Sequence, residues 1–321
     1  MSESPRVSVI VPTLDNARVL GDCLRSIAGD GSSLAREVVV VDNGSRDETA
    51  AVVAAVAAEA NCPVRLVPEP RRGSSHARNA GIAAARGEIL VFADDDVVVE
   101  PGWTDALAAP FADPEVVLVG GRTVPDWPQE PPAWLANGPH IAILTLADFG
   151  AADRELHDDE LPVTANCAAR ADRVRALGTP FSPDLGHQGS RNFGHEDLDF
   201  VERVRRGGRV VYAAGAVAHH RIDPRRMTLG WFRGRFFDLG VAELRMALRD
   251  GETAPALPRR AVRAWRVARG VRRLRRDNDR SERSGPETVE ELKAFIWAGR
   301  HAELLFPRAP RCRDLIRRVL V

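Results

Sequence analysis

Three consecutive acidic residues, Asp94, Asp95 and Asp96, directly follow the apolar run 89–93. Neighbouring carboxylates repel one another, so a folded chain keeps them together when a positive group compensates their charge. Mg²⁺ and Mn²⁺ accept such oxygen ligands and complete their coordination with water and phosphate oxygens. The triplet therefore indicates a divalent-cation site that also binds a diphosphate. A solvated acidic turn is the alternative interpretation.

Two other acidic positions are suited to bind or activate a substrate. Asp42 comes just before Asn43-Gly44, a strong turn signal. Its carboxylate either accepts hydrogen bonds from a nucleobase or a ribose, or serves the turn alone. Glu196 and Asp197 open an expected helix, where they are either a general base at the mouth of a cleft or first-turn acids favoured by the helix dipole.

The basic candidates are Arg78 and the pair His219-His220. Arg78 lies near the Gly/Ser-rich start of an expected helix, where it either pairs with a phosphate or is an ordinary surface arginine. Adjacent residues of an extended chain point in opposite directions. At most one of the two histidines is therefore expected to be a ligand, and a purely structural role is the alternative.

The elements that must position these residues alternate between strand and helix over the first hundred residues. Short apolar, mostly β-branched runs predict strands at 7–11, 38–41, 64–67 and 88–93. Apolar spacing or start signals predict helices at about 15–28, from Arg46 to about Ala60, and from Gly73 to Gly87. The second of these helices is expected to begin at a capping box formed by 45–48.

This βαβαβ order is typical of a doubly wound, mostly parallel sheet, in which ligands bind beyond the carboxyl ends of the strands. Thr13, Asp15, Asp42 and the triplet 94–96 all lie at those predicted ends. The alternation alone therefore predicts that two acidic clusters share one edge of the sheet.

The rest of the chain is less regular. The expected elements are a helix at 103–111, a strand at 116–119, a loop at 125–139, a helix at 167–177, a mobile loop at 178–194, a helix at 196–206, a strand at 209–213 and helices beyond about 225. The loop at 178–194 is expected to act as a lid in front of Asp197. Residues 259–276 hold nine arginines in eighteen positions.

Composition narrows the class of protein. The chain has 321 residues, 45 basic and 45 acidic, and 44% hydrophobic residues, which excludes a disordered or collagen-like chain. No apolar run approaches the ~18 residues of a membrane span. The apolar run 7–11 is too short for the core of a signal peptide, so a cytoplasmic location is expected.

In their order and spacing, several segments resemble a family-two glycosyltransferase of the bacterial type with the GT-A fold. They are 7–13 (VSVIVPT), 37–45 (EVVVVDNGS), 77–81 (ARNAG), 92–96 (FADDD), 101–103 (PGW), 194–197 (GHED) and 217–220 (VAHH). The resemblance implies an α/β GT-A domain over 1–225. A Rossmann-like nucleotide-sugar half would occupy about 1–120 and an acceptor half about 121–225, followed by a helical extension over 226–321.

The resemblance also implies an inverting transfer from a nucleotide sugar, most often a UDP-sugar, to an acceptor hydroxyl. Asp197 would be the base, with Glu196 beside it. Asp96 and His220, with His219 as the fallback, would bind Mn²⁺ or Mg²⁺. The implied donor-binding residues are Pro12, Thr13, Asp15, Asp42, Arg78, Asp94, Asp95 and Asn166.

The sequence departs from the family pattern where the base would bind. Leu14 and Asp15 replace the usual Tyr and Asn, and Asn43 replaces a common second Asp. Uridine is therefore not the only expected base. A small molecule, a glycan or a lipid-linked molecule would be the acceptor.

Two other classes of protein are alternatives. A sugar nucleotidyltransferase needs a Gly-rich basic loop after the first strand, but residues 12–16 contain neither Gly nor Lys. A non-catalytic membrane- or nucleic-acid-binding protein would use the arginines of 259–276. In a glycosyltransferase this segment would contact the inner face of the membrane or pack on its own domain or a homodimer partner, and no nucleic acid is expected.

Overall fold

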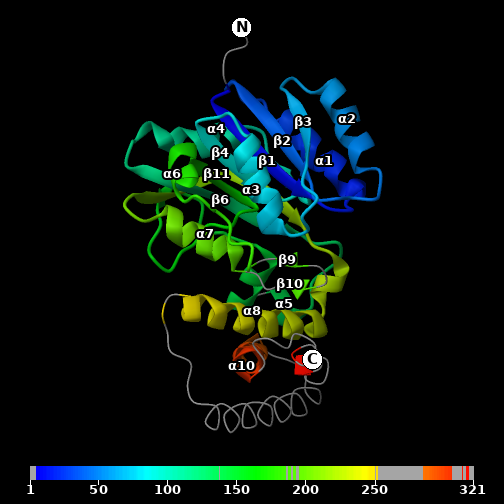
Figure 1. Cartoon of the computed structure of the whole chain (residues 1–321), viewed down its shortest axis with the longest axis vertical. Coiled ribbons are helices and arrows are strands. Elements are labelled where there is room, and N and C mark those ends of the chain that lie inside the picture. The colour runs from blue at the N-terminus through cyan, green and yellow to red at the C-terminus, as the bar shows by residue number, and fades with distance from the viewer. Residues whose placement is uncertain are drawn as a thin grey trace. The chain divides into compact units, whose positions relative to one another are not determined.

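The N-terminal part of the chain alternates strands and helices as predicted (Figure 1). The computed structural model describes residues 5–136, 138–185, 187–188, 191–192, 195–249, 251, 285–305, 313 and 316–317. The first strands are β1 (Val7–Thr13), β2 (Arg36–Asp42), β3 (Val64–Pro68) and β4 (Ile89–Ala93). The helices between them are α1 (Ala17–Ala28), α2 (Thr49–Glu59) and α3 (Ser74–Ala84). β1 pairs in parallel with β2 and β4, and β2 pairs in parallel with β3.

The sheet continues through strands from the second half of the chain, in the order β3-β2-β1-β4-β8-β6-β11-β5. Strand β8 (Asn166–Arg170) is antiparallel to both β4 and β6 (Val116–Asp126). Strand β11 (Arg209–Arg221) is parallel to β6 and antiparallel to β5 (Val97–Val99) and β7 (Arg154–Glu155). The sheet is therefore mixed and mostly parallel.

Helices on both faces bury the central strands. Alternate residues of β1 point to opposite sides, so Val9 and Val11 pack with Leu20 of α1, whereas Ile10 packs with Ala77 of α3. Gly81 permits the close approach of α3, because a Cβ there would lie 2.4 Å from Ile10 Cγ2. This packing fixes the carboxyl ends of β1, β2 and β4 relative to one another.

The predicted capping box at 45–48 is wrong. Helix α2 begins at Thr49 after Glu48, and no side chain caps it. Asp47 instead accepts hydrogen bonds from Thr49 and from the backbone N–H of Ala17 at the start of α1. The polar residues of this turn are thus used to join two loops at the same edge of the sheet.

The helix predicted at 167–177 is wrong in its first part. Residues 166–170 form β8, and only Ala171–Ala176 form a helix, α6. Cys167, Ala168 and Ala169 are completely buried between β4 and β6. Small residues tolerate either conformation, so pairing with two neighbouring strands decides the outcome.

The boundaries of several other elements also differ from the prediction. β6 and β11 are longer than expected, and the expected loop at 125–139 contains α5 (Ala133–Ala136) and the start of a 3-10 helix, Pro139–Leu144. The predicted helix 103–111 is α4 (Trp103–Ala108) followed by a 3-10 turn, Ala109–Ala112. The predicted loop at 178–194 contains β9 (His187–Gln188) and β10 (Arg191–Asn192), and α7 (Glu196–Val204) follows it.

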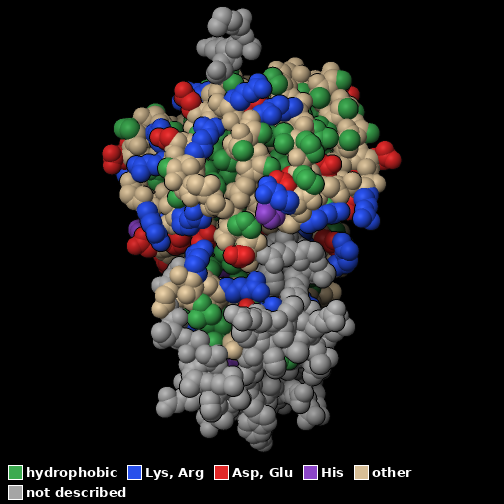
Figure 2. Space-filling view, in the orientation of Figure 1, with side chains coloured by type: hydrophobic (Ala, Val, Ile, Leu, Met, Phe, Trp, Pro, Cys, Tyr) green, Lys and Arg blue, Asp and Glu red, His purple; other side chains and the backbone are tan. Residues whose placement is uncertain are grey.

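The chain forms two compact units. The first contains 1–126, 145–189 and 196–221, and the second contains 127–144, 190–195 and 222–321. The predicted division into a nucleotide-sugar half, an acceptor half and a helical extension stays a prediction. Figure 2 shows basic and acidic side chains interspersed over the visible face of the first unit, in keeping with the balanced charge.

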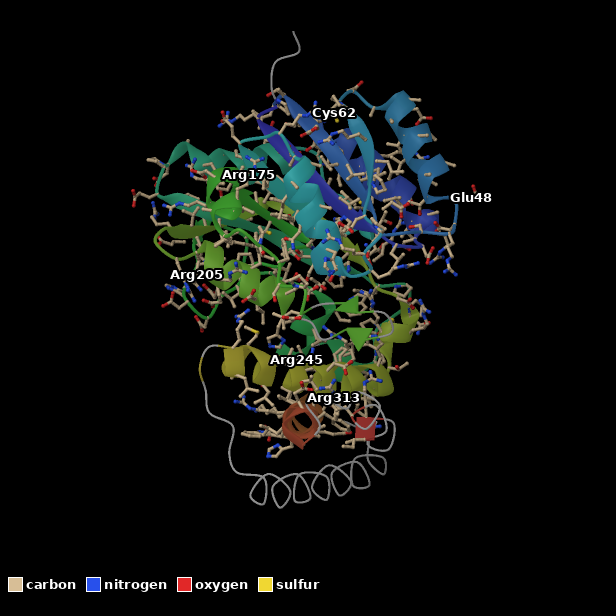
Figure 3. The ribbon with its side chains drawn as sticks, viewed as in Figure 1. Glu48, Cys62, Arg175, Arg205, Arg245 and Arg313 are labelled. Atoms are coloured by element: carbon tan, nitrogen blue, oxygen red, sulfur yellow. The ribbon has the colours of Figure 1, made fainter. Side chains whose placement is uncertain are left out.

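The second unit contains a 3-10 turn (Pro224–Met227), α8 (Leu229–Arg249) and α10 (Gly285–Leu305). Helices α8 and α10 approach closely at two glycines, because a Cβ on Gly240 would lie 1.9 Å from the Ile296 carbonyl oxygen. Gly299 meets α8 in the same way. Glu303 of α10 pairs with Arg245 and Arg313, both labelled in Figure 3.

The Arg-rich segment 259–276 lies outside the described residues, as does its predicted contact with a membrane. Within the described part of the chain, no helix combines the length and the apolar character needed to cross a bilayer.

Candidate active site

The acidic triplet lies where predicted, directly beyond the carboxyl end of β4. Its middle member, Asp95, is tied to the end of β1. Its carboxylate accepts a hydrogen bond from Thr13 Oγ1 at 2.6 Å and another from Asn16 Nδ2 at 2.9 Å. Burial and the charge of Asp96 raise the pKa of Asp95 to about 7. The sequence did not indicate that Asp95 would bind Thr13 and Asn16 in this way. The predicted contact of Asp95 with the donor stays a prediction.

Asp94, Asp96 and His220 form a cluster that fits a divalent cation. One ligand atom from each residue can be chosen so that all three lie within 4.8 Å of one another. His220 is 1% exposed, and its Nε2 lies 3.1 Å from Asp96 Oδ1. Two carboxylate oxygens and one imidazole nitrogen suit Mn²⁺ and leave positions for phosphate oxygens and water.

The two histidines are neighbours on β11 and have different partners. His220 faces the triplet, whereas the Nε2 atom of His219 lies 2.9 Å from Glu100 Oε1, and the His219 side chain is 42% exposed. His220 pairs in register with Val97, immediately after the triplet. The geometry therefore favours His220, the first choice from the sequence, over His219.

Arg78 is buried between three carboxylates, so the surface-arginine interpretation is wrong. Its Nη2 donates to Asp94 Oδ1 at 2.9 Å, while Nη1 lies 3.3 Å from Glu196 Oε1 and 3.4 Å from Asp197 Oδ1. Burial opposes the charge of Arg78, but the three carboxylates outweigh it and raise its pKa. Arg78 thus joins the cation-ligand cluster to the predicted base.

Asp197 lies in the first turn of α7. Burial raises the pKa of Asp197 to about 7. Arg78 and the hydroxyl of Thr164 lower it, whereas Glu196 and Asp94 raise it further. A carboxylate with such a pKa can exchange protons near neutral pH, as a general base must.

Glu196, next to Asp197, is buried and points to α3. Its Oε1 accepts a hydrogen bond from Ser74 Oγ at 2.9 Å. Thr164 and Ser74 are therefore neighbours of the predicted base and its adjoining acid, and the sequence did not indicate them. Single hydroxyl residues carry no spacing signal by which it could have found them.

The loops after β1 and β2 meet at the same edge of the sheet. Asp42 Oδ1 accepts a hydrogen bond from Ser45 N–H at 2.7 Å, and Thr13 pairs in register with Asp42. Asp15 has a φ of +51°, and its carboxylate accepts a hydrogen bond from Arg46 N–H at 2.6 Å. Pro12, Thr13, Asp15 and Asp42 are thus brought together, and their contact with a nucleobase stays a prediction.

Asn43, noted in the sequence as a departure from the family, is a buried link between β2 and α3. Its Nδ2 donates to the carbonyl oxygens of Glu69 and Arg71, and its Oδ1 accepts from Gly73 N–H. An aspartate carboxylate could not donate these two hydrogen bonds. The asparagine at this position therefore fits the loop that leads into α3, whose backbone groups need both a donor and an acceptor.

Asn166, a predicted donor-binding residue, makes its hydrogen bonds within the protein. This residue is 0% exposed. Its Nδ2 donates to the carbonyl oxygens of Arg122 and Ala216, and its Oδ1 accepts from Trp103 Nε1 at 2.8 Å. Both amide hydrogens are used inside the protein, so Asn166 supports the sheet, and its predicted place near the donor stays a prediction.

Comparison with known proteins points to one family. Residues 8–164, just under half of the chain, match the model of Glycosyl transferase family 2. It is 28% identical over 262 residues to the Pre-mycofactocin glycosyltransferase of Mycobacterium tuberculosis, a match that covers 81% of this chain and 52% of that protein. It is also 27% identical over 252 residues to the Succinoglycan biosynthesis protein ExoM of Rhizobium meliloti, covering 78% of this chain and 75% of that protein. The chain thus spans only about half the length of the first of these relatives.

A solved structure confirms the fold. The mannosyltransferase PcManGT from Pyrobaculum calidifontis, solved in complex with GDP-Man and Mn²⁺, superposes with a TM-score of 0.64 at 20% identity. The match covers 96% of this chain and 89% of that one. The mixed, mostly parallel sheet with its flanking helices is therefore the predicted GT-A-type fold.

Proposed function

We propose that this protein transfers a sugar from a nucleoside diphosphate sugar to an acceptor hydroxyl, with inversion at the anomeric carbon. The observation that carries the proposal is the buried Arg78, whose guanidinium contacts Asp94 of the cation-ligand cluster and lies beside Asp197. One rigid group thus joins residues suited to bind a diphosphate to a carboxylate suited to accept a proton.

Asp94, Asp96 and His220 would hold a divalent cation together with the diphosphate. When bound, such a cation stabilises the negative charge that develops on the departing nucleoside diphosphate. Asp95 keeps the triplet in place through Thr13 and Asn16.

Asp197 would accept the proton of the attacking acceptor hydroxyl. Its raised pKa makes it basic enough to remove a proton while still being largely ionised at slightly alkaline pH. Attack from the side opposite to the leaving diphosphate gives inversion. Glu196 would support the base indirectly. It accepts a hydrogen bond from Ser74 and lies close to Arg78.

The nucleobase would bind between the loops after β1 and β2. The carboxylates of Asp42 and Asp15 can accept hydrogen bonds from a base N–H. Both uracil and guanine present such donors. PcManGT was solved with GDP-Man, while the family resemblance favours UDP, so both nucleotides belong in the test.

The experiment is a panel of UDP- and GDP-sugars incubated with the protein and Mn²⁺, with or without a simple alcohol acceptor. Release of nucleoside diphosphate would be followed by a coupled assay, and the anomeric configuration of the product by NMR. We expect the release of nucleoside diphosphate to stop when EDTA is added. We also expect the product to have the inverted anomeric configuration. A retained configuration would refute the single displacement, and activity that is insensitive to chelation would refute the cation.

Asp197→Asn is the matched variant for the base, because the amide keeps the size of the carboxylate but cannot accept a proton in this way. We expect turnover to fall by about 10²–10⁴-fold while nucleotide binding stays intact. Wild-type turnover in this variant would exclude Asp197 as the base.

A further inference from the structure

Residue Asn79 of α3 forms a hydrogen-bonded pair with the backbone of one distant residue. Its Nδ2 donates to the carbonyl oxygen of Phe181 at 2.8 Å, and its Oδ1 accepts from the N–H of Phe181 at 3.0 Å. The amide therefore binds Phe181 as a neighbouring strand would bind it. Two such bonds fix both the position and the orientation of this residue.

The ring of Phe181 connects the strand of the acidic triplet to the helix of the base. It is completely buried, stacks on Phe200 of α7 with ring centroids 4.3 Å apart, and meets Phe92 of β4 edge-on at 5.6 Å. Phe92 and Phe200 also contact one another, at 5.2 Å. Phe92 lies two residues before Asp94, and Phe200 lies one helical turn after Asp197, so these three rings link the strand before the triplet to the helix that carries Asp197.

The same ring supports the arginine that joins those halves. The guanidinium carbon of Arg78 lies 5.4 Å from the centre of the Phe181 ring. A cation over an aromatic face is attracted by the electron-rich ring, more strongly when both are buried. The ring therefore helps to hold Arg78 in its position between Asp94 and Asp197.

We propose that Asn79 and Phe181 are positioning residues, which set the distance and orientation of the Asp197 carboxylate relative to the Asp94–Asp96 cluster. The inference rests on the proposed function, because it assigns Asp197 to the proton transfer. Neither residue is among those that the sequence predicts to bind the donor. Asn79 fixes Phe181, and Phe181 supports Arg78 and packs on Phe200 of α7.

The test compares Asn79→Ala and Phe181→Leu with the wild-type protein. The substrate is the nucleotide sugar that the panel above identifies, with water as the acceptor. Turnover is divided by the number of nucleotide-binding sites, measured by calorimetric titration with the nucleoside diphosphate and Mn²⁺. This normalisation removes any loss of folded protein, which would lower the number of sites and leave turnover per site unchanged.

We expect turnover per site to fall by about tenfold or more in both variants, because misplacing a catalytic group by a fraction of an ångström is costly. The affinity for nucleotide should stay within about twofold, since neither side chain is among the groups expected to contact it. Phe181→Leu keeps an apolar side chain in this core, so it still tests the proposal if Asn79→Ala folds poorly.

Arg175→Ala is the matched control. Arg175, labelled in Figure 3, donates from Nη2 to the carbonyl oxygen of Ala85, just after the end of α3, at 2.8 Å. Its loss removes a side-chain-to-backbone bond at the other end of the same helix and leaves Phe181 untouched. We expect turnover per site close to that of the wild type.

Unchanged turnover per site in both variants would overturn the inference, as would a loss of nucleotide affinity that matches the loss of turnover. These outcomes are distinct from failure of the proposed function. If the wild-type protein itself releases no nucleoside diphosphate from any donor, then the transferase proposal fails and this inference fails with it.

Discussion

At the scale of single residues, the site depends on how burial and charge are balanced around a few carboxylates. Arg78 is surrounded by Asp94, Glu196 and Asp197, which compensate its burial. Asp197, in turn, is buried beside Glu196 and Asp94, with the guanidinium of Arg78 opposing their charge. Burial is the main cause of the raised pKa of Asp197, and this pKa determines how activity should depend on pH.

We expect kcat/KM for the donor to rise with pH through about 7. Burial raises the pKa of Asp197 to about 7, so the carboxylate form that can accept a proton increases as the pH rises past this value. The measurement is the pH profile of nucleotide release at saturating Mn²⁺. A rate that increases as the pH falls below 6 would contradict Asp197 as a base.

The two adjacent histidines allow a matched comparison. His220→Ala removes one of the three cation-ligand candidates and should raise the Mn²⁺ concentration needed for half-maximal activity by about tenfold or more. His219→Ala only breaks an exposed pair with Glu100, so its Mn²⁺ requirement should match the wild type. Equal effects of both substitutions would remove His220 from the site.

At the scale of elements, α3 organises the site. Its first turn contacts Glu196 through Ser74, its middle supplies Arg78 and Asn79, and its inner face packs on β1 at Gly81. The glycine is required by distance and not by backbone conformation, because Ile10 and Val41 occupy the space that a side chain would need. The position of Arg78 therefore depends on how closely this helix approaches the sheet.

Gly81→Ala should destabilise the protein by about 1–3 kcal/mol, the usual cost of forcing an extra methyl into a packed core. The added Cβ would lie 2.4 Å from Ile10 Cγ2. Urea unfolding would measure the loss as a lower midpoint. Gly215→Ala is the control, because Gly215 is exposed and its nearest neighbour would be 3.9 Å away. Equal midpoints for the two variants would argue against this packing.

Strands built from β-branched runs were predicted correctly from the sequence, whereas a strand built from small residues was not. The β-branched runs of β1 and β2 occur where expected because such residues fit a strand buried on both faces. The run Cys167–Ala169 has no such preference, and only its two neighbouring strands make it β8. The hydrogen bonds of Asn166 could not be predicted from the sequence either, because its partners are far away in the chain.

At the scale of the whole molecule, the described residues of the proposed site belong to one of the two units. Asp42, Arg78, the triplet, Asp197 and His220 all lie in the unit made of 1–126, 145–189 and 196–221. The other unit is stabilised internally by the contact of α8 with α10 and by ion pairs such as Arg233 with Glu291. A ligand of the proposed site should therefore stabilise the first unit directly.

We expect nucleoside diphosphate with Mn²⁺ to raise the unfolding temperature in scanning calorimetry. A ligand at 100 times its Kd that binds only the folded state stabilises it by about 2.7 kcal/mol. Asp96→Asn should abolish the shift, since it removes one of the cation-ligand candidates. A shift of the same size in this variant, or in the presence of EDTA, would show that binding does not depend on the cation.

The sequence by itself determined that acidic residues follow several parallel strands, because alternating apolar runs and helices place the ends of those strands at one edge of a sheet. It also determined the order of the family's segments, from 7–13 to 217–220. Only the tertiary structure decided that His220 and not His219 faces Asp96, that Arg78 is buried between three acids and that Asn79 holds Phe181. The reason is physical: local pattern specifies which face of an element is apolar, whereas the partner of a polar side chain can lie more than a hundred positions away.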